Sequence, residues 1–145
     1  MIKKNNIKSR KRSYEPSDKE KFMNPRQVEY FKQLLLTWKD DLLKESSNTL
    51  DHLKEESSNK PDNADRASIE SVRSLELRTR DRERKLLSKI NKALKKIEDG
   101  TYGYCEDTNK PISIKRLIAR PIATLSLEAQ ESHEKSERIY KEKEY

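Results

Sequence analysis

Residues 61–67 read Pro-Asp-Asn-Ala-Asp-Arg-Ala, and the sequence on either side of them is patterned as two helices folded back on each other. Apolar residues on both sides recur at spacings of three and four, which is typical of one helix face. Six apolar residues before this stretch pair with six after it, such that the two residue numbers of every pair add to the same total. The pairs are Val28 with Ile97, Phe31 with Leu94, Leu35 with Ile90, Trp38 with Leu87, Leu50 with Leu75, and Leu53 with Val72. This constant total predicts an antiparallel coiled-coil hairpin that reverses between residues 62 and 63.

Start and stop signals predict the ends of the two arms. Residues 24–27, Asn-Pro-Arg-Gln, combine a favoured N-cap with proline at the first helical position, so the first arm is predicted over 25–59. Asp65 is the expected N-cap of the second arm, which should run to Asp99 and stop at Gly100. Midway along the hairpin the predicted seam becomes polar, so we expect tight packing near the base and looser packing further out. The polar seam positions are Ser46, Thr49, Glu76, Thr79 and Glu83.

The remaining segments predict a mainly α-helical protein with a small globular end. Residues 1–16 are expected to be a disordered basic tail, and 17–99 to hold a short N-terminal helix followed by the hairpin, with its tip at 60–67. The short helix is predicted from the capping box of residues 17–20, Ser-Asp-Lys-Glu. Within 100–145, residues 101–104 and 112–114 alternate like two strands of a β-hairpin, joined by a turn at 108–111. A charged helix should run from about Thr124 to the end.

Composition favours long solvated helices over a large compact core, because 31% of the residues are hydrophobic and 41% are charged. The net charge is +7, but six basic residues and no acidic ones lie within residues 1–12, so the remainder is almost neutral. This distribution argues against a dedicated nucleic-acid reader and allows only weak, salt-sensitive binding of polyanions by the tail. No apolar run approaches the length of a membrane span, and residues 1–12 lack the apolar segment of a secretory signal. We therefore expect a soluble, cytoplasmic protein.

Few residues have the pattern of a chemical site. Asp62 and Asp65 are either ordinary turn and cap residues or carboxylates presented to a metal, a cation or a basic loop. Cys105 is the single cysteine, and His52 and His133 are expected near the tip and near the far end, so a tetrahedral zinc site is not supported. Neither a catalytic triad nor a phosphate-binding loop is present, so we expect no enzyme. A stripe on one face of the second arm, consisting of Arg82, Lys85 or Leu86, and Lys89, could hold a phosphate with help from elsewhere.

Five stretches resemble the DksA family, and the similarity covers about residues 25–135. They are Asp62-Asn63-Ala64-Asp65-Arg66-Ala67, Ser74-Leu75-Glu76-Leu77-Arg78, Arg80-Asp81-Arg82-Glu83-Arg84-Lys85-Leu86, Gly103-Tyr104-Cys105-Glu106, and Ile114-Lys115-Arg116-Leu117-Ile118-Ala119-Arg120-Pro121. The resemblance implies a coiled-coil hairpin on a zinc-finger-like globular end. It also implies a monomeric regulator that inserts the hairpin through the secondary channel of bacterial RNA polymerase, without sequence-specific DNA binding.

The resemblance also assigns site residues. The family's tip residues fall on Asp62, Asp65 and Ala67. Its site for guanosine tetraphosphate (ppGpp), formed at the polymerase interface, draws on Arg82, Leu86, Lys89 and Arg120, whereas a further basic position is occupied by Gln130. The four zinc-binding positions hold Cys105, Thr108, Ser126 and Ala129, as in the cysteine-poor branch of the family, so zinc is not expected. An apolar core should replace the metal, formed by Tyr102, Tyr104, Ile112, Ile114, Leu117 and Leu125.

Two alternatives remain open from the sequence. A transcript-cleavage factor also uses an acidic-tipped hairpin, which holds a catalytic Mg²⁺. A structural coiled-coil adaptor would use the same hairpin but would be indifferent to the tip carboxylates.

Overall fold

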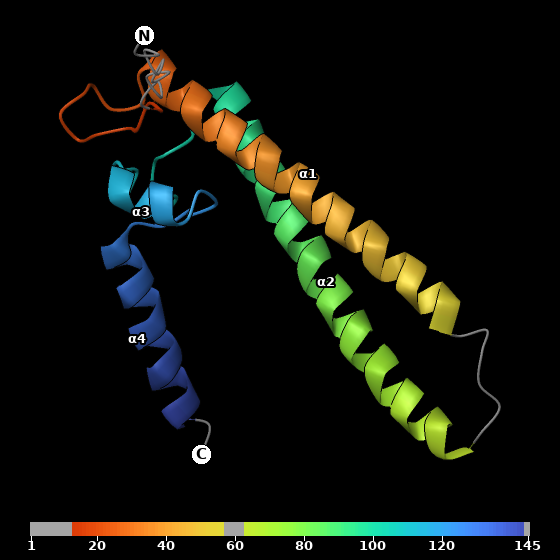
Figure 1. Ribbon diagram of the computed structural model, residues 1–145. Coiled ribbons are helices and arrows are strands. Elements are labelled where there is room, and N and C mark those ends of the chain that lie inside the picture. The colour runs from red at the N-terminus through yellow and green to blue at the C-terminus, as the bar shows by residue number, and fades with distance from the viewer. Residues whose placement is uncertain (1–12, 57–62, 144–145) are drawn as a thin grey trace, which may run out of the picture.

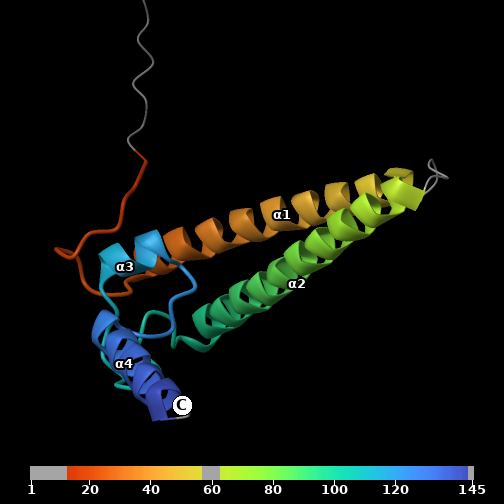
Figure 2. The same cartoon turned by 90° about the horizontal axis from the view of Figure 1, so that it is seen from below.

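The computed structural model describes residues 13–56 and 63–143, which form four helices and several non-helical segments. Helix α1 (Pro25–Glu56) and helix α2 (Asn63–Asp99) run antiparallel as one long hairpin (Figure 1). Helix α3 (Ile114–Ala119) and helix α4 (Leu127–Lys143) belong to a small globular end at the base of the hairpin, and α4 diverges from the hairpin in both views (Figures 1 and 2). The predicted mainly helical fold is confirmed. Within these described residues, no helix has a stretch that is long and apolar enough to cross a membrane.

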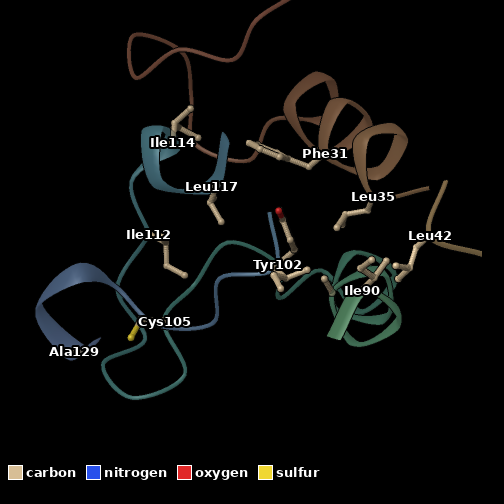
Figure 3. Packing of buried hydrophobic residues seen from close by; sticks show 12 residues of the cluster. Phe31, Leu35, Leu42, Ile90, Tyr102, Cys105, Ile112, Ile114, Leu117 and Ala129 are labelled. Atoms are coloured by element: carbon tan, nitrogen blue, oxygen red, sulfur yellow. The ribbon is translucent and has the colours of Figure 1, made fainter. Parts of the chain in front are cut away.

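The base of the hairpin is tightly packed, as the apolar pairing predicts. Phe31 and Leu35 of α1 and Ile90 of α2 are fully buried and lie in one cluster (Figure 3). Removing a side chain of this size from water stabilises a fold by roughly 1.5–3 kcal/mol. These contacts therefore hold the two helices in register where they join the globular end.

The distal half of the hairpin is packed more loosely. Val72 and Leu75, which the pairing pattern places in the seam, are 42% and 63% exposed, so this part of the prediction is wrong. The two helices diverge toward the tip (Figure 1). The side chains of their predicted partners, Leu50 and Leu53, lie outside the described residues, as do residues 57–62, which contain the reversal. Polar residues at the intervening seam positions explain the divergence, because they give the helices little apolar surface to bury together.

Glu83→Leu is expected to stabilise the protein. Glu83 Oε2 is buried but has no hydrogen-bond partner within the described part of the chain. Glu83 lines a groove with Leu42, which lies opposite it in the hairpin register. An apolar side chain at this position would remove the cost of burying the carboxylate and would pack on Leu42. We expect urea denaturation to show a free energy of unfolding higher by about 1–2 kcal/mol. The exposed Glu70→Leu substitution is the control, and an equal gain from both would contradict the explanation.

The N-terminus of α1 and the C-terminus of α2 form as the local sequence predicts. Asn24 Oδ1 accepts a hydrogen bond from the Gln27 backbone N–H at 2.9 Å, so Asn24 caps α1. Gly100 has φ +76° and lies in the left-handed conformation that ends α2. Its N–H donates to the Ile97 carbonyl, and the next N–H, of Thr101, donates to the Lys96 carbonyl at 2.9 Å. This pair of bonds is a Schellman motif.

The N-terminus of α2 differs from the prediction. The helix begins at Asn63, so Asp65 lies in its first turn and is not its N-cap. A carboxylate in the first turn still interacts favourably with the helix dipole. Asp62, Asn63 and Asp65 are all residue types that are favoured as an N-cap. Local signals therefore do not decide which residue begins the helix.

Residues 13–24 form an ordered strap across the base of α1, which we call the N-terminal strap. The predicted short helix is absent, since these described residues adopt turns and bends. Residues 13–16, which were predicted to belong to a disordered tail, are part of this strap, because Pro16 is buried and the Tyr14 ring packs edge-on against Tyr30 of α1. The rest of the predicted tail lies outside the described residues. The Arg26 guanidinium lies 4.2 Å from the Tyr14 ring centre. The fully buried Gln27 accepts from the Met23 N–H at 2.9 Å and donates to the Ser17 carbonyl at 3.2 Å. These tertiary contacts outweigh the capping-box signal.

The predicted β-hairpin of the globular end is reduced to a single antiparallel bridge, and a helix follows it. Among the described residues, β-pairing is limited to one isolated bridge between Tyr104 and Pro111. Ile112–Ile114 does not continue as a strand, because the Ser113 hydroxyl accepts from the Arg116 N–H and caps α3. The predicted C-terminal helix is confirmed as α4, but it begins at Leu127 and not near Thr124, because Ser126 Oγ caps it by accepting from the Ala129 N–H.

The core of the globular end is largely the predicted one. Tyr102, Ile112, Ile114 and Leu117 are buried, and Leu125 is half-buried against them (Figure 3). Tyr104 is the exception, since it is 39% exposed and its ring packs edge-on against Phe22 of the strap. A side chain at Gly103 would lie 2.9 Å from Met23 Cε, so the strap and this loop are in close contact. The strap therefore joins the globular end to the hairpin.

Candidate functional site

A cavity of about 240 Å³ lies between the last turns of α2 and the loops of the globular end, and its walls are strongly basic. Lys89, Lys92 and Lys96 share one face of α2 because they are spaced by three and four residues. Arg116 of α3 and Arg120 at its C-terminus complete the charged lining. We call this cavity the basic pocket. Five cations around one concave surface are suited to a polyanionic ligand.

The cations of the basic pocket have different partners. Glu106 Oε1 lies 3.0 Å from Lys92 Nζ and 2.6 Å from Lys96 Nζ. The hydrogen bond from Lys96 and that from Lys92 lower the pKa of the Glu106 carboxyl, so it stays ionised at neutral pH. The Arg116 Nε–H donates to the Leu125 carbonyl at 2.9 Å, which fixes its guanidinium at the pocket wall.

The structure brings together only part of the predicted nucleotide site. Lys89 and Arg120 line the basic pocket, and so does the half-buried Gln130 of α4. Leu86 and Arg82 lie about one and two turns before Lys89 on α2, toward the tip, where Leu86 packs against the core and Arg82 is exposed. A ligand in the pocket could reach them only by extending along the face of α2.

Three pocket residues were missed by the sequence reasoning. Lys92 and Lys96 continue the helical spacing of Lys89, so this periodicity was a signal that could have identified them. Arg116 and its distant partner Leu125 carry no such local signal. Their contact depends on how α3 is placed against the following loop.

The predicted tip residues lie at the other end of the molecule. Asp62 falls outside the described residues. Asp65 is on the described backbone of α2, and its side chain is outside the described part. Ala67 is exposed on the first turns of α2. The tip and the basic pocket are thus separated by almost the full length of α2, and a single small ligand cannot contact both.

The four positions of the family's zinc site come together around the Cys105 thiol. Cys105 is 1% exposed, Ala129 is buried in the first turn of α4, and the two lie near each other (Figure 3). Burial opposes ionisation of the thiol. Hydrogen bonds from the Thr108 hydroxyl and from the backbone of Ser126, Thr108 and Asp107 outweigh burial and lower the pKa of Cys105 to about 6. Zinc needs four strong ligands, and these residues supply one thiolate, so they do not fit the metal.

Purified protein is expected to contain no stoichiometric zinc. Threonine and alanine are not zinc ligands, and the Ser126 hydroxyl is occupied as the cap of α4. Elemental analysis of protein purified without chelator should give far less than one zinc per chain, and chelators should not change its unfolding midpoint. A value near one zinc per chain would contradict this.

Stability is expected to rise between pH 6 and about 9 through Cys105. An unfolded thiol titrates near about 8.5, so the folded protein ionises at lower pH than the unfolded chain. The stabilisation is therefore complete above the unfolded pKa and is lost as the pH falls through about 6. Urea midpoints measured across this range should rise for the parent and rise less for Cys105→Ser, whose hydroxyl does not titrate. Parallel profiles for the two proteins would contradict this.

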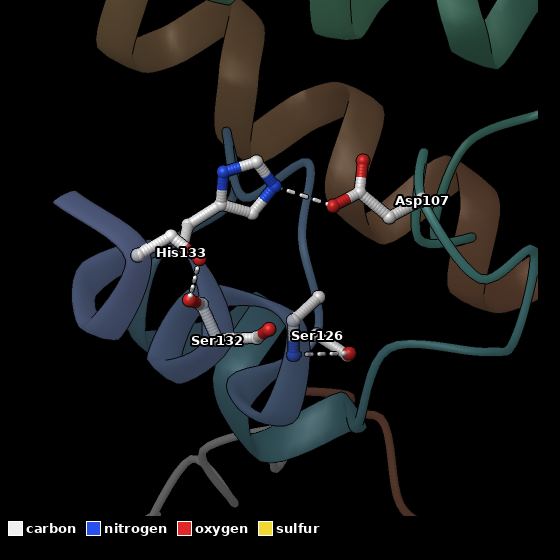
Figure 4. Close-up of polar contacts among 6 residues, drawn as sticks. Asp107, Ser126, Ser132 and His133 are labelled. Carbon is white, nitrogen blue, oxygen red and sulfur yellow. Dashed lines mark hydrogen bonds and ion pairs between the residues drawn. The ribbon is translucent and has the colours of Figure 1, made fainter. Parts of the chain in front are cut away.

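His133 lies closer to Cys105 than expected. The sequence reasoning placed it at the far end of the molecule, away from Cys105, but its Nε2 is 2.5 Å from Oδ2 of Asp107 (Figure 4). Asp107 is two residues from Cys105, so the contact ties α4 to the loop that holds the thiol. Among the described residues, no group of three or more His, Cys, Asp and Glu side chains could hold a metal ion.

Sequence comparisons match both parts of the chain. The profile described as "DnaK suppressor protein DksA, N-terminal domain" matches residues 27–97, and "Prokaryotic dksA/traR C4-type zinc finger" matches residues 100–135. The chain is 59% identical over 132 residues to the RNA polymerase-binding transcription factor DksA of Caulobacter vibrioides, covering 91% of this chain and 93% of that protein. The factor of the same name from Salmonella typhimurium is 46% identical over 117 residues, which is 81% of this chain and 78% of that one.

Among solved structures, the chain is similar to the transcription factor DksA2 from Pseudomonas aeruginosa. The TM-score is 0.76 at 40% sequence identity, and the match covers 81% of this chain and 90% of the other. The similarity therefore extends over the hairpin and the globular end together.

Proposed function

The chain belongs to the DksA family, and on that premise we propose that it is a transcription factor that binds bacterial RNA polymerase and is not an enzyme. The observation that carries the proposal is the continuous similarity, at 59% identity over 91% of the chain, to a relative named as an RNA polymerase-binding factor. The hairpin, the globular end and their arrangement are shared with a solved transcription factor of the same family.

The hairpin is the part that we propose enters the polymerase, through its secondary channel. Helix α1 has 32 residues, so the arm is about 50 Å long. Its distal half has polar residues along the seam, which suits a segment that enters a water-filled channel. Asp62 and Asp65 at its end would act on elements of the polymerase active site and destabilise short-lived promoter complexes. The factor would act in the cytoplasm as a monomer and without contacts to promoter sequence.

The basic pocket is the proposed site for ppGpp. Lys89 and Arg120 supply cations to one cavity, and the polymerase would cover the opening and add further donors. Exposed charges bind a phosphate weakly in water because solvent and salt screen them, whereas the covered interface has a lower dielectric and strengthens each contact. Gln130 provides no charge at the pocket wall, so the response should be smaller than in relatives with a basic residue there.

In vitro transcription tests this function. Purified factor added to bacterial RNA polymerase should change transcription from a ribosomal promoter, and ppGpp should strengthen the change. The same preparation should not shorten transcripts in stalled complexes, which separates the proposal from the cleavage-factor alternative. A factor that neither alters transcription nor competes with a known channel ligand for the polymerase would overturn the proposal, and indifference to the tip carboxylates would favour a structural adaptor.

A further inference from the structure

The basic pocket carries its own anion. Of the five cations that line it, Lys92 and Lys96 both contact the carboxylate of Glu106, at 3.0 and 2.6 Å. The two lysines are one helical turn apart on α2, and one oxygen, Glu106 Oε1, lies within reach of both. A phosphate oxygen placed in the pocket would compete with this carboxylate for the same two ammonium groups.

Glu106 is held in place by its backbone. Its N–H donates to the Thr124 carbonyl at 2.9 Å, and the preceding N–H, of Cys105, donates to the Lys110 carbonyl at 2.9 Å. The Lys96 side chain is 19% exposed, so its pair with Glu106 is partly shielded from solvent. The backbone of Glu106 is therefore fixed beside the lysines, whereas its side chain is 40% exposed and can turn away when a ligand takes its place.

The remaining cations face the pocket without such a partner. Lys89 and Arg120 are exposed, and within the described part of the chain neither takes part in a salt bridge. Lys89 and Lys92 lie on the same helix, have the same chemistry and line the same pocket. They differ in that only Lys92 is paired with Glu106, which makes them a matched pair for experiment.

We propose that Glu106 is a built-in counter-anion of the basic pocket, which lowers the affinity of the free protein for polyphosphates by holding Lys92 and Lys96 until a ligand displaces it. The assignment of ppGpp as the ligand rests on the function proposed above. The free protein then binds polyphosphate weakly, and the donors added by a partner at the pocket opening make displacement of the carboxylate favourable. Binding is in this way restricted to the assembled complex.

The first test uses the free, full-length protein and inorganic tripolyphosphate, with ppGpp as a second probe, in titration calorimetry. Glu106→Gln keeps the size of the side chain and removes its charge. We expect it to bind tripolyphosphate roughly two- to fivefold more tightly at low salt, the scale of a partly exposed ion pair, with a smaller gain at higher salt. Glu98→Gln makes the same charge change on an exposed residue outside the pocket and should change the affinity much less. Equal affinities for these two variants would overturn the proposal.

The second test compares two lysine variants, first with Glu106 in place and then in the Glu106→Gln background. In the parent, Lys92→Gln should weaken tripolyphosphate binding less than Lys89→Gln does, because Lys92 is already neutralised. In the Glu106→Gln background, Lys92→Gln should cost as much affinity as Lys89→Gln. If Lys92→Gln and Lys89→Gln weaken tripolyphosphate binding equally in the parent, Glu106 does not keep Lys92 from binding the ligand. The comparison in the parent needs no Glu106 variant, so it tests the counter-anion even if Glu106→Gln does not fold.

The two proposals fail separately. Tighter tripolyphosphate binding by Glu106→Gln, together with transcription that does not respond to ppGpp, would support the counter-anion and remove ppGpp as the physiological ligand. A normal transcriptional response to ppGpp, together with no gain in tripolyphosphate affinity from Glu106→Gln, would support ppGpp as the ligand and exclude the counter-anion.

Discussion

Asp65→Asn is expected to abolish the effect of the factor on transcription while leaving its binding to RNA polymerase close to that of the parent. Asparagine has nearly the same shape as aspartate, so the substitution removes the charge with little change in packing. If the carboxylate makes a charge-assisted contact at the polymerase active site, its loss costs about 1.5–3 kcal/mol, or roughly tenfold or more in regulation. Transcription from a ribosomal promoter, measured at increasing factor concentration, gives this effect directly.

The substitution should cost the fold little. Asp65 lies in the first turn of α2, where a carboxylate interacts with the helix dipole, and that interaction is worth about 0.3–1 kcal/mol. Asp51→Asn is a suitable control, since Asp51 is an exposed acid on α1 outside the tip motif. The control should regulate as the parent does. If Asp65→Asn also regulates as the parent does, the tip carboxylate has no role in the mechanism.

Lys89→Ala is expected to remove the stimulation by ppGpp and to leave regulation without the nucleotide largely intact. Lys89 lines the basic pocket, is exposed and has no salt-bridge partner within the described residues, so its ammonium is available to a phosphate. The pocket is at the opposite end of α2 from the tip, and the substitution should therefore not disturb the tip. Titrating ppGpp into transcription reactions should give a strong response for the parent and almost none for the variant.

Lys95→Ala is the matched control for this experiment. Lys95 is exposed on the same helix and does not line the pocket. It should respond to ppGpp as the parent does, which separates the pocket from a general loss of positive charge. Gln130→Lys should act in the opposite direction to Lys89→Ala, because it adds a cation to the same cavity. Equal stimulation of the parent and Lys89→Ala would exclude this pocket as the nucleotide site.

Local signals in the sequence determined the hairpin and its ends near the base. The register predicted from apolar spacing placed Phe31, Leu35 and Ile90 in the seam, and all three are fully buried. Asn24 caps α1, and Gly100 ends α2 with a positive φ, as their residue types predict. These features depend on residues within one or two helical turns, or on a periodicity that continues for many turns, so one sequence is enough to detect them.

Short or weak patterns were decided by tertiary packing. Ile112–Ile114 alternates like a strand over only three residues. Ser113 is the N-cap of α3, so Ile114 is the first residue of that helix. Residues 17–20 fit a capping box, but the contacts of the strap with Gln27 and with the Gly103 loop held them in turns. Val72 and Leu75 had the correct spacing for the seam and are exposed, because too few apolar residues surround them to close the helices.

The basic pocket and its counter-anion were decided only by the tertiary structure. The sequence identified Lys89 and Arg120 through a family resemblance, but it could not show that Lys92, Lys96 and Arg116 line the same cavity or that Glu106 holds two of these lysines. Likewise, the contact of His133 with Asp107 spans 26 positions in the chain. Such contacts depend on the path of the loops that connect the helices, and that path follows from the packing of the whole globular end and not from any local pattern of residues.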